Sequence, residues 1–488
     1  MSKKVIIIGA GIAGLSAGIY ARRSGFDVTV IEQHTIPGGM CTSWWRKGYL
    51  FEGAMHWLTG SNPKIELNEI WRDTGALSDN VKIIYPDVFA SVEWEGKIVR
   101  IYRDIEKTRK HFLEISPEDS TAINQLVKDV QTLTKMSIPI IDIKGVKTRN
   151  PKKMGLGKTL KMMSAFSVMN KTLKMSCDEY AARFKHPALR KLMGCMPPDS
   201  GANILLFSLA TLAKGDGGYP EGGSLAMAQR MADTYKLLGG KLSLGTKVKR
   251  VIVKNGTATG VELENGTLPA DAVIVTQETM AAVEQLFTES LEDKWISDLR
   301  KNTKPQVCTF VSVGVRAEIP ETPTFELSEP IICGGISYYE LGFNNYSDYT
   351  DYAPKGGTSL TTPFMHDTYD FWKKAKDEGR YEVEKQNLAE QISRAICAKY
   401  PQAEGKIEVI DIATPLTYER YTGAYHGSWM GIMSKGDKQK EYSGFLKSIK
   451  GVYFAGHRMT NPGGQPIALL SGRKAAQMVC RQFDVIFK

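Results

Sequence analysis

The sequence lacks the features that mark several protein classes. Of its 488 residues, 42% are hydrophobic and 24% are charged, which excludes a disordered, collagen-like or small disulfide-stabilised chain. Its 7 cysteines form no Cys-x-x-Cys pair and its histidines show no metal-ligand spacing, so we expect a reduced intracellular chain without a metal site. No stretch approaches about 20 uninterrupted apolar residues, and the apolar run 5–8 breaks into glycines, so neither a transmembrane helix nor a signal peptide is expected. These absences favour a cytoplasmic protein, with any membrane contact peripheral and at the inner face.

Acidic residues are missing from residues 143–177. The whole chain has 63 lysines and arginines against 53 acids, a formal charge of +10, and nine of the bases lie in this stretch. In helical projection Met162, Phe166, Met169 and Leu173 form one apolar stripe bordered by lysines. Such a basic helical lobe is typical of a protein that binds an anionic membrane surface, and an apolar substrate could then enter the protein directly from the lipid. The alternative is that the lysines form a solvated basic face and the apolar stripe packs in the core. No nucleic-acid-binding motif accompanies the charge, so no nucleic-acid partner is expected. The nine bases are Lys144, Lys147, Arg149, Lys152, Lys153, Lys158, Lys161, Lys171 and Lys174.

A glycine motif near the N-terminus carries the strongest signal. The β-branched run 5–8 leads into Gly9-Ala10-Gly11-Ile12-Ala13-Gly14, then a segment suited to a helix, and then a second strand that ends before Glu32. In this context the glycines allow a tight turn, close approach of the backbone to a pyrophosphate, and packing of the helix on the strand. The amides at the helix start form an anion site, and Glu32 can accept hydrogen bonds from an adenosine ribose. The motif therefore predicts a dinucleotide-binding α/β unit.

The identity of the dinucleotide follows from the next residues. A second glycine pair, Gly38-Gly39, follows Glu32 where a nicotinamide-binding unit usually continues to another crossover helix, which favours FAD. No second glycine motif of this kind occurs after a strand. We therefore expect no separate nicotinamide domain, and an external electron donor or acceptor.

Two distant segments agree with this interpretation. Asn255-Gly256 and Asn265-Gly266 are signals for type I′ hairpins, which predict a small antiparallel meander before a buried strand at 270–275. Near the C-terminus a strand and turn at 451–457 precede Pro466, which is well placed to open a helix. The N-terminus of that helix could stabilise negative charge on a reduced flavin.

These segments together resemble the FAD-dependent phytoene desaturase family, which includes carotenoid isomerases and retinol saturases and is more distantly related to amine oxidases. The resemblance implies an α/β fold with a discontinuous, Rossmann-like FAD-binding domain of the glutathione reductase and amine oxidase type, and an inserted α+β substrate domain. The expected FAD-binding domain comprises residues 1–65, 215–290 and 440–488. The expected substrate domain comprises 66–214 and 291–439, with the basic lobe at about 143–177.

The resemblance also implies an activity. Members move hydride between flavin and a carbon–carbon bond of an apolar, carotenoid-, retinoid- or isoprenoid-like substrate, and the sequence leaves desaturase, saturase and isomerase open. Two alternatives also stay open: a flavin amine oxidase relative, and a non-catalytic lipid- or prenyl-binding protein of the GDP dissociation inhibitor type.

Site residues are carried over from the family by position. The glycines of the first motif would line the pyrophosphate, Glu32 would hold the ribose, and Val248 would present its backbone to the adenine. Two residues depart from the pattern: Met40 stands where many relatives carry arginine, and His457 where relatives often have an acid. The predicted cofactor-binding residues are Gly9, Gly11, Ala13, Gly14, Glu32, Gly38, Gly39, Met40, Val248, Gly456, His457, Gly464 and Gln465.

Candidates for the catalytic groups are few. Hydride transfer needs the reacting carbon close to the flavin, exclusion of water, and a proton donor or acceptor beside the substrate. His56 lies on a segment expected to pass near the flavin ring, and Tyr418, Arg420 and Tyr421 lead into the C-terminal motif. His56 could instead support packing or the cofactor, and the triplet Tyr418-Glu419-Arg420 could be an internal ion-pair anchor.

Overall fold

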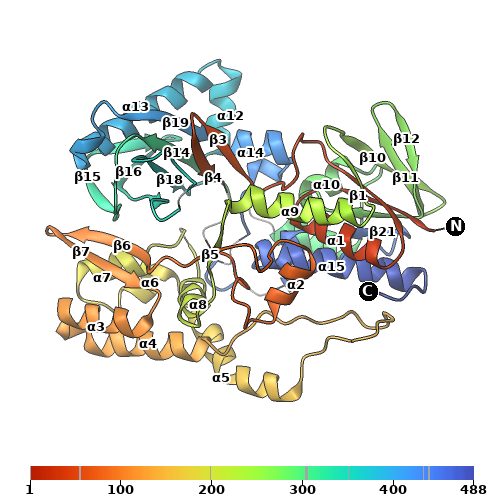
Figure 1. Ribbon diagram of the computed structural model, residues 1–488, viewed down its shortest axis with the longest axis horizontal. Coiled ribbons are helices and arrows are strands. Elements are labelled where there is room, and N and C mark those ends of the chain that lie inside the picture. The colour runs from red at the N-terminus through yellow and green to blue at the C-terminus, as the bar shows by residue number, and fades with distance from the viewer. Residues whose placement is uncertain are drawn as a thin grey trace.

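The centre of the molecule is a five-stranded parallel sheet (Figure 1). The computed structural model describes residues 2–53, 57–197, 199–302, 306–349, 351–431, 434–437 and 440–488. The sheet has the order β21-β13-β1-β2-β9, and all of its neighbouring strands run parallel. Its strands come from chain segments more than 200 residues apart, which confirms the predicted discontinuous α/β arrangement. They are β1 (Lys4–Ile8), β2 (Asp27–Ile31), β9 (Lys241–Ser243), β13 (Ala272–Val275) and β21 (Val452–Phe454).

The two faces of this sheet are covered differently. Alternate residues of a strand point to opposite faces, so Val5 and Ile7 of β1 pack with the helices, whereas Ile6 and Ile8 pack toward the antiparallel meander. The near-continuous apolar sequence of β1 and β13 follows from this burial on both sides. The helices are α1 (Ile12–Arg23), α9 (Gly223–Leu237) and α15 (Gln465–Gln482), and the meander is β10 (Val248–Lys254), β11 (Thr257–Leu263) and β12 (Gly266–Pro269).

The two turns of the meander differ. Asn255 and Gly256 both have positive φ, 49° and 68°, as the predicted type I′ turn requires. In the second hairpin Leu263 pairs with Gly266, so the loop residues are Glu264 and Asn265, and neither has positive φ. The second hairpin is present as predicted, but its turn is one residue earlier and is not type I′.

A second sheet and its helices lie apart from the parallel sheet, at the upper left of Figure 1. Its strand order is β17-β18-β14-β19, all antiparallel, and α13 packs on it through an apolar core of its own. These elements are β14 (Thr309–Val315), β17 (Asn344–Asn345), β18 (Thr358–Phe364), β19 (Ile407–Ala413), α12 (Tyr369–Asp377), α13 (Tyr381–Lys399) and the hairpin β15 (Phe325–Cys333) and β16 (Ile336–Leu341). The sheet is followed by α14 (Pro415–Thr422).

A helical lobe with its own core fills the lower left of Figure 1. Its helix starts are well specified: Asp104 caps α3, and Ser176 with Glu179 forms a capping box on α6. The lobe comprises α3 (Ile105–Ile115), α4 (Ser120–Leu133), α5 (Leu156–Thr172), α6 (Cys177–Ala181), α7 (Pro187–Met193), α8 (Ala202–Ala213), β6 (Val88–Trp94) and β7 (Lys97–Tyr102). Shorter connecting elements are β3 (Ser43–Arg46), β4 (Tyr49–Glu52), α2 (Leu67–Asp73), β5 (Ile83–Ile84), β8 (Tyr219–Pro220), α10 (Thr279–Gln285), α11 (Lys294–Asn302), β20 (Lys440–Glu441) and β22 (Thr460–Asn461).

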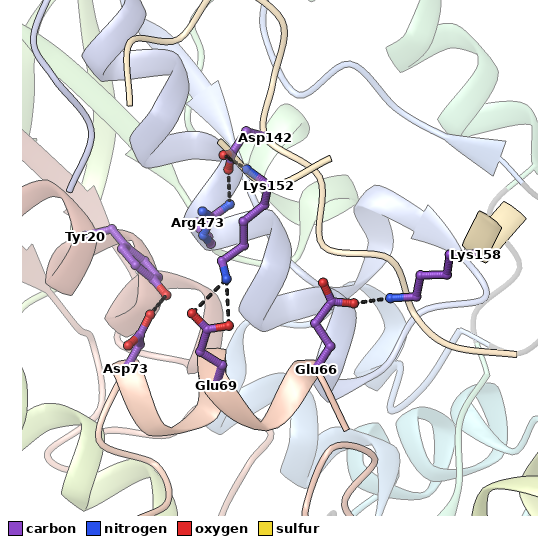
Figure 2. A network of polar contacts seen from close by, with 8 residues as sticks. All are labelled: Tyr20, Glu66, Glu69, Asp73, Asp142, Lys152, Lys158 and Arg473. Atoms are coloured by element: carbon purple, nitrogen blue, oxygen red, sulfur yellow. Dashed lines mark hydrogen bonds and ion pairs between the residues drawn. The ribbon is translucent and has the colours of Figure 1, made fainter. Parts of the chain in front are cut away.

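Residues 134–155, here called the strap, connect α4 to α5. Figure 2 shows polar contacts that Asp142 and Lys152 of the strap make with the parallel-sheet domain and with α2. Asp142 of the strap accepts a hydrogen bond of 2.6 Å from Nη1 of Arg473 on α15, and both side chains are only about 5% exposed. Lys152 pairs with Glu69 of α2 at 2.6 Å, and its backbone N–H donates to Asp142. Lys158 of α5 pairs with Glu66. Through these contacts the strap holds the helical lobe against the sheet domain.

The basic stretch differs from its prediction in one respect. Met162 is buried, and Met169 packs into the lobe core, because α5 rests on α4 and α8 through this stripe. Phe166 alone of the predicted stripe is well exposed. The alternative interpretation of the stripe as a core face is therefore correct for most of its length.

Candidate functional site

A cavity of about 440 Å³ lies at the carboxyl ends of four strands of the parallel sheet. Ile8 and Ile31, the last residues of β1 and β2, line it, as do Thr276 after β13 and Gly456 after β21. Ligands of open α/β sheets bind at this edge. The sheet topology therefore places the cavity where a dinucleotide is expected.

The first glycine motif forms one wall of the cavity. Gly9, Gly11 and Ala13 line it, and Gly9 has a φ of +104°, which favours glycine. Gly14, which was predicted to bind the cofactor, is not among the described residues that line the cavity. A Cβ at Gly14 would lie 1.9 Å from the carbonyl oxygen of Gly9, so this glycine allows α1 to pack on β1. No side chain caps α1 at Gly11, which leaves the amides of the first turn available to an anion.

The second glycine pair supports this wall. Gly38 donates its N–H to the carbonyl of Ala10 at 2.9 Å, and a Cβ on Gly39 would lie 3.5 Å from Cα of Gly11. Met40 follows and lines the same cavity. The pair therefore brings residues 38–40 against the start of α1, as a cofactor-binding role for them requires.

Glu32 is held at the end of β2 by backbone groups. Its carboxylate accepts hydrogen bonds from the N–H groups of Ala10 at 2.7 Å and His34 at 2.8 Å. The side chain is buried, and burial raises its pKa. Val248, at the start of β10, lines the cavity on the same side. This end of the cavity has the acceptor and the backbone expected for an adenosine.

The C-terminal motif forms the other end of the cavity. His457 lines it, and burial, with a contribution from Arg458, lowers its pKa to about 3, so the imidazole is neutral at physiological pH. α15 begins at Gln465 after Gly464, again without a side-chain cap. Oε1 of Gln465 is buried and has no hydrogen-bond partner among the described residues. A buried acceptor of this kind is normally satisfied, so its place in the lining suggests a ligand donor.

Sequence reasoning missed a buried ion pair in this cavity. Nε of Arg458 lies 2.5 Å from Oε1 of Glu278, and the two side chains are 6% and 5% exposed. Oε2 of Glu278 also caps α10 by accepting from the N–H of Ala281. The signal was present, because Thr276-Gln277-Glu278 directly follows β13, whose carboxyl end borders the cavity.

The predicted catalytic residues are less well gathered than the predicted cofactor residues. Tyr418 is buried in an apolar cluster beside Cys308 and Trp429, and burial raises its pKa. Arg420 is exposed, with its guanidinium 4.4 Å from the ring centre of Tyr421, which is 43% exposed. None of Tyr418, Arg420 and Tyr421 is among the described residues that line the cavity. His56 lies outside the described residues, and the catalytic roles of all four stay predictions.

The residues around the cavity fit FAD. Two helix starts without side-chain caps suit the pyrophosphate, a buried carboxylate suits the ribose, and the orphaned Gln465 acceptor suits a hydrogen-bond donor on the ring. Within the described ranges, no three His, Cys, Asp or Glu side chains gather as a metal site would require.

The comparison with known families agrees with this site. Residues 12–480 match the profile of the flavin containing amine oxidoreductases. The chain belongs to this family. It is therefore an FAD-dependent oxidoreductase, which confirms the cofactor that the second glycine pair favoured and the activity that the family resemblance implied. Among the part of this flavoprotein that the structure describes, no helix is long and apolar enough to cross a bilayer.

Curated relatives align with this flavoprotein over nearly its full length. It is 23% identical to the 1-hydroxycarotenoid 3,4-desaturase of Flavobacterium sp. (strain P99-3), with 98% of this chain and 99% of the relative covered. It is 21% identical to the 4,4'-diapophytoene desaturase of Methylomonas sp, with 100% and 97% covered. The 4,4'-diaponeurosporene oxygenase of Staphylococcus haemolyticus is 24% identical, with 98% and 97% covered.

Solved structures share the fold of this flavoprotein. An oxidoreductase from Methanosarcina mazei superposes with a TM-score of 0.58 at 17% identity, with 98% of this chain and 99% of that chain covered. The cyclohexylamine oxidase of Brevibacterium oxydans gives 0.59 at 15% identity, with 99% and 100% covered. These likenesses confirm the predicted fold class.

Proposed function

We propose that this flavoprotein moves hydride between its flavin and a carbon–carbon bond of an apolar, isoprenoid-like substrate. The observation that carries the proposal is an apolar wall of the flavin cavity, at the end that the C-terminal motif forms. Met40, Trp429 and Met430 line the cavity and also belong to, or pack against, the cluster around Phe310 and Tyr418. A hydrocarbon gains by contact with such a surface. The full-length similarity to proteins named as carotenoid desaturases supports the same substrate class.

The protein's own residues have distinct tasks in this proposal. Bound FAD supplies the hydride acceptor or donor. The amides of α1 and the carboxylate of Glu32 bind and orient the cofactor, and the apolar cluster excludes water from the reacting carbons. Neutral His457 adds no charge at the ring end, whereas the first turn of α15 stabilises negative charge there. Electrons enter or leave through an external partner.

The substrate class and direction can be tested together. The oxidised and the reduced protein are incubated anaerobically with lipid extracts and with individual polyprenoid hydrocarbons, while the flavin absorbance is recorded. We expect one redox state to react, with a product whose mass differs from the substrate's by two hydrogens, or an unchanged mass and a new isomer. Turnover of amines with no response to any polyprenoid would contradict the proposal. A protein without flavin would favour the lipid-binding alternative.

We further propose that α5 brings the protein to an anionic membrane surface. Exposed apolar side chains recur along α5 at Leu156, Leu160 and Met163, a spacing that puts them on one face, and they are 81%, 60% and 60% exposed. α5 lies at the lower margin of the molecule in Figure 1. Six bases of the stretch are exposed and have no ion pair among the described residues. They are Lys144, Arg149, Lys153, Lys161, Lys171 and Lys174.

Membrane docking is tested by flotation with neutral vesicles and with vesicles that contain anionic lipid. We expect recovery with anionic vesicles only, because each cation near the interface contributes about 1 kcal/mol. Changing Lys161, Lys171 and Lys174 to glutamate should abolish it. The matched control changes Lys373, Lys374 and Lys376 of α12, far from the basic stretch in the sequence. Equal recovery with both vesicle types, or equal effects of the two triple variants, would contradict the docking proposal.

A further inference from the structure

A second cavity adjoins the flavin cavity. It has a volume of about 410 Å³ and shares Trp429 and Arg458 with the flavin cavity. Its described lining comes from five parts of the chain: the helical lobe near Asp199, the end of α11 with residues 306–307, the residues after β18, the segment between Trp429 and Tyr442, and the C-terminal residues 458–461. The two cavities therefore meet at Trp429 and Arg458.

Polar side chains dominate the described lining of the second cavity, in contrast to the apolar cluster behind Trp429. The charged residues of the described lining are three acids and three bases, so these residues together carry no net charge that would attract an anion. They are Asp199, Asp367, Asp437, Lys301, Lys440 and Arg458. The lining is therefore suited to an uncharged polar group and poorly suited to a hydrocarbon.

Arg458 offers a hydrogen-bond donor at the junction of the two cavities. Its Nε is paired with Glu278 at 2.5 Å, and its Nη2 donates to Oγ of Ser428. Nη1 has no hydrogen-bond partner in the part of the chain that the structure describes, and a Cβ added to Gly431 would lie 4.0 Å from it. Glu278 already neutralises the charge of the guanidinium. The remaining N–H groups therefore suit an uncharged oxygen as acceptor.

His366 provides a second polar group in the same cavity. Its Nδ1 lies 2.8 Å from the hydroxyl oxygen of Tyr338, and the two rings meet edge-on with centres 5.3 Å apart. A Tyr338 hydroxyl that donates to Nδ1 fixes the imidazole and leaves the Nε2 hydrogen free to donate. The side chain of Asn461, which also lines the cavity, can donate or accept.

We propose that the second cavity binds a hydroxyl or carbonyl end of an otherwise apolar substrate, whose reacting carbons lie in the flavin cavity. This inference rests on the proposed function and names the substrate's end group. A hydrocarbon end would desolvate Nη1 of Arg458 and Nε2 of His366 without giving either a hydrogen-bond partner, which is unfavourable. An oxygen at that end would satisfy them and fix how far the chain enters past Trp429.

The test measures binding to the flavin-loaded protein, with flavin absorbance as the readout. The probes are geranylgeraniol, geranylgeranial, geranylgeranoic acid and the hydrocarbon without the oxygen. We expect the alcohol and the aldehyde to bind roughly fivefold tighter than the hydrocarbon, the value of one hydrogen bond, and the acid to bind no tighter than the alcohol. Equal affinities for alcohol and hydrocarbon, or tightest binding of the acid, would overturn the subsite.

Two variants locate the effect. Arg458→Lys keeps a cation for Glu278 but cannot reach Ser428 and the cavity at once, and His366→Phe removes the imidazole nitrogens at similar size. Each should reduce the ratio of the alcohol affinity to the hydrocarbon affinity, whereas Arg394→Lys on the exposed side of α13 should leave the ratio unchanged. An unchanged ratio in His366→Phe and in Arg458→Lys would overturn the inference. A protein that binds none of the four probes would overturn the proposed function itself.

Discussion

The flavin cavity and the basic lobe differ in what determines their structure. In the flavin cavity the constraints are local and lie in the backbone, because Gly9, Gly14 and Gly38 sit where another residue would clash or need an unfavourable φ. In the basic lobe the orientation of α5 depends on α4 and α8, and its attachment depends on Asp142 and Arg473, which are 331 residues apart. Local constraints can be read from a sequence, whereas distant partners cannot.

The largest expected effect is on the attachment of the lobe. Arg473→Met leaves the buried carboxylate of Asp142 without its cation, and breaking a buried pair in this way costs about 3–5 kcal/mol. We expect the variant to have a lower Tm than the wild type. We also expect its amide exchange to accelerate more in the strap than in the rest of the protein. Arg394→Met, on the exposed side of α13 and outside the strap, is the control. A Tm equal to that of the control would show that the pair does not hold the strap.

The next effect compares one substitution in the two regions. Gly14→Ala places a Cβ 1.9 Å from a backbone oxygen and should cost about 1–3 kcal/mol, with loss of bound flavin. Gly157→Ala, in the first turn of α5, meets nothing within 4 Å and should stabilise the protein by about 0.5–1 kcal/mol. Thermal unfolding and flavin content measure both. We expect the change in unfolding free energy to have opposite signs in the two variants. A change of the same sign in both would contradict the contrast between the two regions.

The attachment of the strap should depend on pH through the carboxylate of Asp142. Hydrogen bonds from the N–H of Lys152 and from Arg473 outweigh burial and lower the pKa of Asp142. Since this pKa lies below the unfolded value of about 3.9, the carboxylate stabilises the fold above that pH and its contribution is lost as the pH falls through the folded pKa. The protection of the strap amides, measured relative to their intrinsic exchange rate at each pH, should therefore decrease below about pH 4. Asp142→Asn should exchange faster at neutral pH without that dependence, and a wild-type strap insensitive to pH would contradict this.

The smallest expected effect is on cofactor affinity. Glu32→Gln keeps an oxygen acceptor for the N–H groups of Ala10 and His34 but removes the charge, so binding of a ribose hydroxyl should weaken by about 1–2 kcal/mol. FAD titration of the apoprotein measures this change. Glu264→Gln, exposed in the second meander turn, is the control. An affinity equal to that of the control would remove Glu32 from the cofactor site.

Features set by neighbouring residues could be predicted from the sequence, whereas features set by distant partners could not. Every predicted cofactor residue except Gly14 lines the cavity, because strand, glycine turn and helix start are contiguous in sequence. The pair Arg458–Glu278 was missed because its partners are 180 residues apart and the family pattern assigned a role to neither. The apolar stripe of α5 was correctly located, but the sequence could not tell which side of the helix the rest of the lobe covers.

One measurement tests directly whether the cavity at the strand ends holds FAD. The purified protein is denatured, and the released chromophore is identified by its absorbance and mass and quantified against the protein. We expect FAD close to one per chain, and little or none from Gly14→Ala. A colourless protein that releases no FAD, and that does not take it up when FAD is added, would show that this cavity does not bind FAD.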